Sequence, residues 1–84
     1  MEKLQNGIFD TTLVSLDIAI DNMKMHGGQY SHLYWQNGTF IYIDHQIKKL
    51  MINTPTGKFK FTDHYLFNLG LFLENYFFLM DSEL

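Results

Sequence analysis

The four histidines are the side chains of this sequence best suited to holding a metal ion, because the chain contains no cysteine. His32 and His45 fall in an expected β-hairpin, where they would lie diagonally on one face. Asp44 or Asp63 could add an oxygen ligand, but Asp44 and His45 are neighbours in an extended run and point to opposite faces. We therefore expect partly buried, hydrogen-bonded histidines and no metal. A metal or small-ligand site on the His32/His45 face is the alternative.

Catalytic motifs are missing from the sequence. The Gly27-Gly28 pair ends an expected helix, whereas a phosphate-binding loop would open one. Neither a G-x-S-x-G nor an H-E-x-x-H pattern occurs, and the lack of cysteine excludes a thiol nucleophile. The sequence predicts a protein that is not an enzyme and that carries no cofactor.

The basic residues are all lysines, and four of the six lie in one short region. Residues 45–63 carry a formal charge of +3, whereas residues 1–44 and 64–84 each carry −3. Aromatic rings beside these lysines could stack on the bases of a single strand. Lysines without arginine give a small electrostatic footprint, and the acidic flanks oppose it. The balance is against a nucleic-acid partner, and single-strand binding is kept as an alternative centred on Lys48, Lys49, Lys58 and Lys60.

Length and composition predict one compact domain spanning residues 1–84. The chain is 46% hydrophobic and 17% aromatic, which excludes disorder, and its net charge is −3. Glu2, Asp10 and Asp17 interrupt what would have to be the apolar centre of a signal peptide. Residues 65–80 are too short and too polar to span a membrane. We expect a soluble, cytoplasmic protein without disulfides and without membrane partners.

Helical periodicity marks the N-terminal quarter of the chain. Asp10 and the two threonines after it offer a helix cap, and Gly27 offers the end of a helix that runs to His26. One apolar stripe is expected to face the core: Phe9, Leu13, Leu16, Ile20 and Met23. A second stripe of Val14, Ile18 and Met25 lies roughly opposite, so one sheet cannot cover both.

Alternation with a period of two begins at Gln29. Asn37-Gly38 predicts a two-residue type I′ hairpin between strands at 30–36 and 39–44, with Tyr34 opposite Ile41. Further strands are expected at 47–53 and 58–61. Neither face of the hairpin is polar. We expect the face that carries Tyr30, His32 and Tyr34 to be covered by a helix, a second protomer or a partner.

Residues 62–80 are predicted to form a C-terminal helix capped by Thr62-Asp63. Its broad core face leaves a stripe of Phe67, Leu71 and Phe78, with Glu74 in line, that has no obvious partner in the chain. The predicted fold class is α+β, with an N-terminal helix, a three- or four-stranded antiparallel sheet containing the Asn-Gly hairpin, and a C-terminal helix packed on the sheet.

A chain of this size has a thin stability margin, and unpartnered apolar stripes point to association. In size, acidity and lack of catalytic motifs it is similar to the small inhibitor proteins made by phages and other mobile elements. We predict a non-enzymatic interaction protein, homodimeric, that binds and inhibits or modulates a larger protein partner. The residues expected to form its interfaces are Val14, Ile18, Met25, Tyr30, His32, Tyr34, Phe67, Leu71, Glu74 and Phe78.

Overall fold

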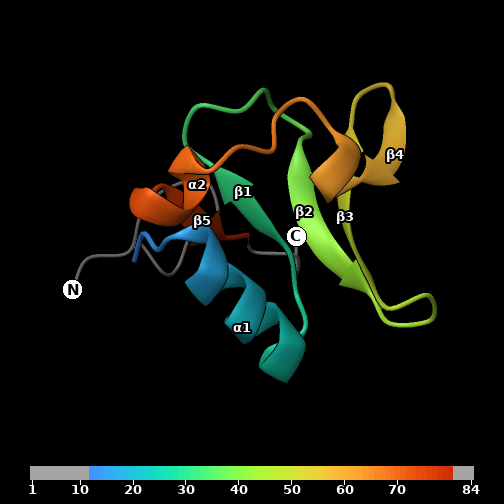
Figure 1. Ribbon diagram of the computed structural model, residues 1–84, viewed down its shortest axis with the longest axis horizontal. Coiled ribbons are helices and arrows are strands. Elements are labelled where there is room, and N and C mark those ends of the chain that lie inside the picture. The colour runs from blue at the N-terminus through green and yellow to red at the C-terminus, as the bar shows by residue number, and fades with distance from the viewer. Residues whose placement is uncertain (1–11, 81–84) are drawn as a thin grey trace.

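The computed structural model describes residues 12–80, which form an α+β arrangement as the sequence predicts (Figure 1). Within that range the elements are α1 (Leu16–His26), β1 (Tyr30–His32), β2 (Phe40–Asp44), β3 (Lys49–Thr54), β4 (Gly57–Lys60), the 3-10 turn η1 (Phe61–Asp63), α2 (Gly70–Leu73) and β5 (Phe77–Leu79). The strands make one antiparallel sheet in the order β4-β3-β2-β1-β5. The last strand of the chain therefore returns to lie beside the first.

The N-terminal helix starts later than the sequence predicts. Val14 is held extended, because its backbone N–H and C=O each make a 2.9 Å hydrogen bond with the backbone of Phe77. Helix α1 can begin only after this bridge, with Ser15 as the N-cap residue. Its end is as predicted, since Gly27 takes a φ of 74° and its N–H donates to the carbonyl of Met23 at 2.9 Å. The predicted cap at Asp10 lies outside the described residues.

The Asn-Gly hairpin is not the two-residue turn that the sequence predicts. Strand β1 ends at His32, and the chain turns there because Trp35 N–H donates to the His32 carbonyl at 3.1 Å. A second turn follows, in which Gly38 has a φ of 88° but Asn37 does not share the positive φ that a type I′ turn needs. The seven residues 33–39 thus connect the strands as a loop.

The longer loop between β1 and β2 shifts the register of these two strands, but each side chain stays on the face of the sheet that the sequence predicts. Tyr30 lies opposite Ile41, whereas the predicted turn would have placed Tyr34 there. The difference is four residues, an even number, and side chains alternate with a period of two. Tyr30 and His32 therefore still share a face with Ile41 and Ile43, as expected from the sequence.

The predicted C-terminal helix over residues 62–80 is wrong in most of its length. Only the four residues of α2 are α-helical, and residues 77–79 form strand β5. Asn68 and Asn75 are weak helix formers, and aromatic residues such as Tyr76 and Phe77 favour strands. The deciding factor is tertiary: β5 finds hydrogen-bonding edges on both sides, from β1 and from Val14.

The two faces of the sheet differ in what covers them. The first face packs on α1, η1 and α2, and the buried apolar residues of the core are Leu16, Ala19, Met23, Tyr30, Ile41, Ile52, Phe61, Leu71 and Phe77. By strand alternation, the second face carries Ser31, Phe40, Tyr42, Asp44, Lys49, Met51, Asn53, Lys58, Lys60 and Phe78. No helix between residues 12 and 80 has the length and apolar character needed to cross a membrane.

Two leucines of the α2 region provide a matched test of this packing. Leu71 is 7% exposed and Leu69 is 75% exposed. We expect Leu71→Ala to lower the free energy of unfolding by about 2–4 kcal/mol, because a core cavity is left behind, and Leu69→Ala to change it by less than about 0.5 kcal/mol. Urea denaturation of the two variants measures both values, and equal losses would contradict the described position of α2.

Candidate functional site

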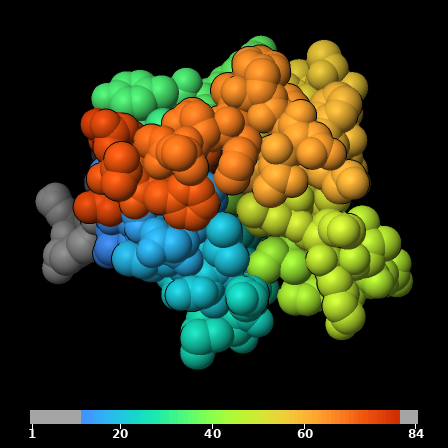
Figure 2. Space-filling model, viewed as in Figure 1, coloured from blue at the N-terminus to red at the C-terminus, as the bar shows by residue number. Residues whose placement is uncertain are grey.

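A hollow of about 500 Å³ lies where the β1–β2 loop meets the segment between η1 and β5. Half of its lining residues carry aromatic rings, and the residues that line it are His32, Tyr34, Trp35, Tyr65, Leu66, Asn68, Gly70, Leu71, Glu74 and Tyr76. We call it the aromatic hollow. Figure 2 shows the segment after β4 (orange to red) lying across the front of the molecule, with the β1–β2 loop (green) along its upper edge.

Four rings of the aromatic hollow contact one another, at both steep and shallow angles. Tyr34 and Tyr76 meet edge to face, with centroids 5.2 Å apart and planes at 80°. His32 lies 5.5 Å from Tyr76 at 73°, and it stacks on Trp35 at 5.3 Å with planes only 19° apart. Two tyrosine walls at nearly a right angle thus stand over a floor of stacked His32 and Trp35.

His32 is positioned by its own turn. Its Nδ1 accepts a hydrogen bond from the backbone N–H of Tyr34 at 3.1 Å, which places the proton of the neutral imidazole on Nε2. Burial lowers the pKa of His32 below its ordinary value, and the negative charge of Glu74 partly opposes this effect. The ring is therefore neutral at pH 7. Among the residues that line the hollow, the Glu74 carboxylate is then the group that carries a full charge.

A second hollow, of about 410 Å³, adjoins the first. The two share Tyr34, Trp35, Tyr65 and Leu66, and the second continues over Pro55 in the β3–β4 turn. Tyr65 stacks on the His64 ring at 4.5 Å, and the His64 Nδ1 accepts the backbone N–H of Leu66 at 3.2 Å. The depression is therefore elongated, and Tyr34 and Tyr65 belong to both of its halves.

Large exposed side chains line the aromatic hollow or are chain neighbours of residues that line it. Tyr34 is 75% exposed and Tyr65 is 86% exposed. Leu69 and Leu73, on either side of the residues of α2 that line the hollow, are 75% and 83% exposed. These side chains come from segments some thirty residues apart, which the fold brings together.

Four of the predicted interface residues meet in this hollow. His32 and Tyr34 were expected on a hairpin face, and Leu71 and Glu74 on a helical stripe, yet all four line one depression. Tyr30 does not join them, because it is buried in the core and its hydroxyl accepts a hydrogen bond from the side chain of Asn22 at 3.0 Å.

The predicted stripe of Phe67, Leu71 and Phe78 does not form, because the helix that would have aligned it is absent. The ring of Phe67 packs edge to face on Phe61 at 5.3 Å, Leu71 is buried, and Phe78 lies on β5 opposite Ser31.

The predicted α1 stripe is also divided by the structure. Val14 is bridged to β5 before α1 begins, whereas Ile18 and Met25 are exposed on the helix. Of this stripe, only Ile18 and Met25 offer apolar surface on the helix itself.

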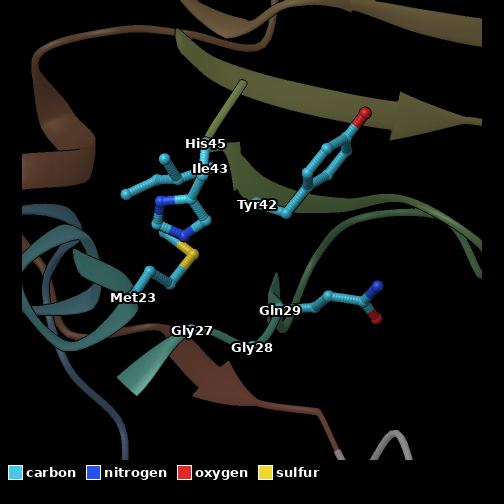
Figure 3. Close-up of a pocket in the computed structure, with 7 residues that line it drawn as sticks. All are labelled: Met23, Gly27, Gly28, Gln29, Tyr42, Ile43 and His45. Carbon is cyan, nitrogen blue, oxygen red and sulfur yellow. The ribbon is translucent and has the colours of Figure 1, made fainter. Parts of the chain in front are cut away.

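His32 and His45 are not neighbours. With Tyr30 opposite Ile41, His45 lies six residues beyond the position that faces His32, or about 20 Å at the usual rise per residue. His45 instead borders a separate hollow of about 240 Å³ between the start of β1 and β2, where Met23, Ile43 and His45 gather on one side and Tyr42 and Gln29 on the other (Figure 3). In the described part of the chain, no three His, Asp or Glu side chains form a group able to hold a metal ion.

The lysines of the nucleic-acid alternative mostly share one face. Lys49, Lys58 and Lys60 project from the second face of the sheet, which also carries Phe40 and Tyr42, with ring centroids 6.0 Å apart. Lys49 lies opposite Asp44, and strand β3 separates Lys58 and Lys60 from the two rings. Lys48 lies instead in the β2–β3 turn with a φ of 58°. Lys60 also pairs with Asp63 at 3.8 Å, an exposed contact of little energetic weight.

The sequence did not predict that Trp35, Tyr65 and Tyr76 would belong to a candidate site. The sequence predicts a strand at Trp35 and a long C-terminal helix that would contain both Tyr65 and Tyr76. Their grouping depends on β5 returning to β1, which no local pattern signals.

No protein-family model matches the chain, and comparison with curated proteins and with solved structures finds no match either.

The effect of the Glu74 charge can be measured through the titration midpoint of the His32 ring. NMR titration of the His32 ring should give a midpoint below the ordinary value of about 6.5, and Glu74→Gln should lower it further, because the carboxylate favours the imidazolium. Between the lowered and the ordinary pKa the unfolded chain binds more protons than the folded one, so stability should fall as the pH falls through this window. A His32 midpoint that is unchanged in Glu74→Gln would show that the carboxylate does not face the ring.

Proposed function

We propose that this protein is a non-enzymatic interaction protein that binds a larger protein through the aromatic hollow and the exposed apolar residues around it. The observation that carries the proposal is that the highly exposed Tyr34 and Tyr65 line a concave surface rich in aromatic rings, while the exposed Leu69 and Leu73 are chain neighbours of the lining residues Gly70 and Glu74. Tyrosine and tryptophan in well-packed pockets dominate the energetics of protein interfaces. Bound there, the protein would inhibit or modulate its partner by covering part of that partner's surface.

Exposed apolar groups of this kind favour association because burial of each large side chain contributes about 1.5–3 kcal/mol relative to water. Contiguous apolar patches on a small protein mark interaction sites. Self-association remains a prediction. The sequence based it on an exposed stripe that includes Leu71, and the structure does not support that stripe, because Leu71 is a core residue. Exposed Ile18 and Met25 on α1 are the remaining predicted residues that a homodimer could use.

Site-specific photo-crosslinking tests the proposal. Leu69 and Met25 are almost equally exposed, at 75% and 74%. Leu69 lies in the chain between Asn68 and Gly70, which line the hollow, whereas Met25 lies near the C-terminal end of α1. A photoreactive residue at Leu69 should give a specific adduct with a larger protein in extracts of the source cells, and the same residue at Met25 should not. Equal adducts from both positions, or adducts from Met25 alone, would contradict the proposed surface.

A second candidate function is single-strand nucleic acid binding on the second face of the sheet. It is favoured by one observation, that Lys49, Lys58 and Lys60 share this face with the adjacent rings of Phe40 and Tyr42. Bases stack on such rings and lysines contact the phosphates. The rings are half-buried, however, and the lysines are few, so the geometry favours the first proposal.

Lys58 and Lys24 provide a charge-matched test of this alternative. Both are exposed lysines, on β4 and α1 respectively. If the second face binds a labelled oligothymidine in fluorescence anisotropy, Lys58→Gln should reduce the dependence of log K on log salt by about 0.7, the value for one single-strand phosphate contact. Lys24→Gln should leave it unchanged. Absence of binding at low salt, or equal effects of the two variants, would exclude this function.

A further inference from the structure

The aromatic hollow has the composition of a site for a positively charged group. The face of an aromatic ring carries a negative potential, and a cation within about 6 Å of several ring faces is attracted by all of them. The perpendicular rings of Tyr34 and Tyr76 form a corner with the stacked pair of His32 and Trp35 below it. All four rings line the same hollow, so a cation bound in it would lie close to several aromatic side chains.

The charges around the hollow agree with this reading. Glu74, at the C-terminal end of α2, contributes a carboxylate to the lining. Its charge acts on His32, because it raises the pKa of that imidazole against the effect of burial. The buried His32 ring stays neutral and adds no opposing charge. No lysine is among the lining residues.

The shape of the depression favours a side chain carried on an extended segment. The adjoining hollow continues past Tyr65 to the β3–β4 turn, so residues beside the cation would find a second concave surface. Leu66 and Leu71 add apolar surface to the lining of the aromatic hollow. A lysine or arginine side chain suits both the cation site and the apolar surface beside it, because its methylene stem is apolar and its head is charged.

We infer that the aromatic hollow binds a lysine or arginine side chain of the protein partner, held by the rings of Tyr34, Trp35 and Tyr76 and by the carboxylate of Glu74. The inference rests on the proposed function and adds the chemistry of the partner to it. A basic segment with apolar residues beside the cation is the ligand class that this surface recognises.

Two short peptides test the inference on the whole protein. One carries a lysine flanked by leucines, and in the other norleucine replaces the lysine, which removes the charge and keeps the stem. Trp35 is the single tryptophan of the chain, so its fluorescence and its indole NMR signal report directly from the hollow. The lysine peptide should shift both signals saturably, and the norleucine peptide should bind more weakly by roughly two- to five-fold, the range of an exposed cation–π contact.

A pair of variants separates local from overall charge. Glu74→Gln and Asp63→Asn each remove one negative charge from an exposed position, but Asp63 does not line the hollow. Glu74→Gln and Tyr34→Leu should each weaken binding of the lysine peptide, by roughly two- to five-fold for the lost cation–π or charge contact, and Asp63→Asn should leave it unchanged. Amide NMR spectra establish that each variant is folded.

Three outcomes would overturn the inference: equal binding of both peptides, no binding of either, or equal weakening by Glu74→Gln and Asp63→Asn. Each is distinct from failure of the proposed function, which the crosslinking at Leu69 decides. If Leu69 crosslinks to a larger protein but the lysine and norleucine peptides bind equally, the surface binds proteins through apolar groups alone. Specific binding of the lysine peptide without crosslinking would leave a cation site whose natural ligand is not a larger protein.

Discussion

The pairing of Phe77 with two other segments is the interaction on which the rest of the structure depends. Its backbone is bridged to Val14 on one side and lies opposite His32 on the other, and its side chain is fully buried. This one residue joins the segment before α1, the first strand and the last strand. It sets where α1 can begin and prevents the 62–80 region from continuing as a helix.

The same residue links the core to the candidate site. The ring of Phe77 contacts His32 at 5.0 Å and Trp35 at 5.3 Å, both edge to face, and Trp35 also meets Phe61 at 5.7 Å. The floor of the aromatic hollow is thus one side of the aromatic core. In a chain that forms no disulfide, large buried rings supply much of the apolar area that stabilises the fold. Stability and recognition therefore draw on the same cluster, with buried rings below and exposed tyrosines above.

Charge is divided between two surfaces. Glu74 makes the hollow acidic, whereas Lys49, Lys58 and Lys60 make the second face of the sheet basic. The two proposed functions use these surfaces separately, and they call for partners of opposite charge. The exposed tyrosines and leucines lie beside the acidic surface, while the rings of the basic surface are half-buried. Because affinity comes mainly from desolvated aromatic contacts, this difference favours the protein partner.

The sequence by itself determined the features that depend on neighbouring residues. Gly27 ends α1 because a positive φ suits glycine. The alternation from Tyr30 onward places Tyr30 and His32 on one face with Ile41 and Ile43, because the register differs from the predicted one by an even number of residues. It also predicted a strand at residues 58–61, where the structure has β4 (Gly57–Lys60). Four hollow residues were named from sequence, but as parts of two unrelated surfaces.

Only the tertiary structure decided the C-terminal region and the composition of the site. Residues 65–79 have a helical apolar spacing, and a local pattern contains no information that two strand edges lie within reach of Phe77. Backbone pairing with segments some 45 and 63 residues away outweighed local propensity, since an unpaired buried edge leaves backbone groups unsatisfied. Trp35, Tyr65 and Tyr76 converge as a consequence of that pairing. Contacts between segments far apart in the chain are set by the whole fold, and the spacing of residues within one segment does not contain them.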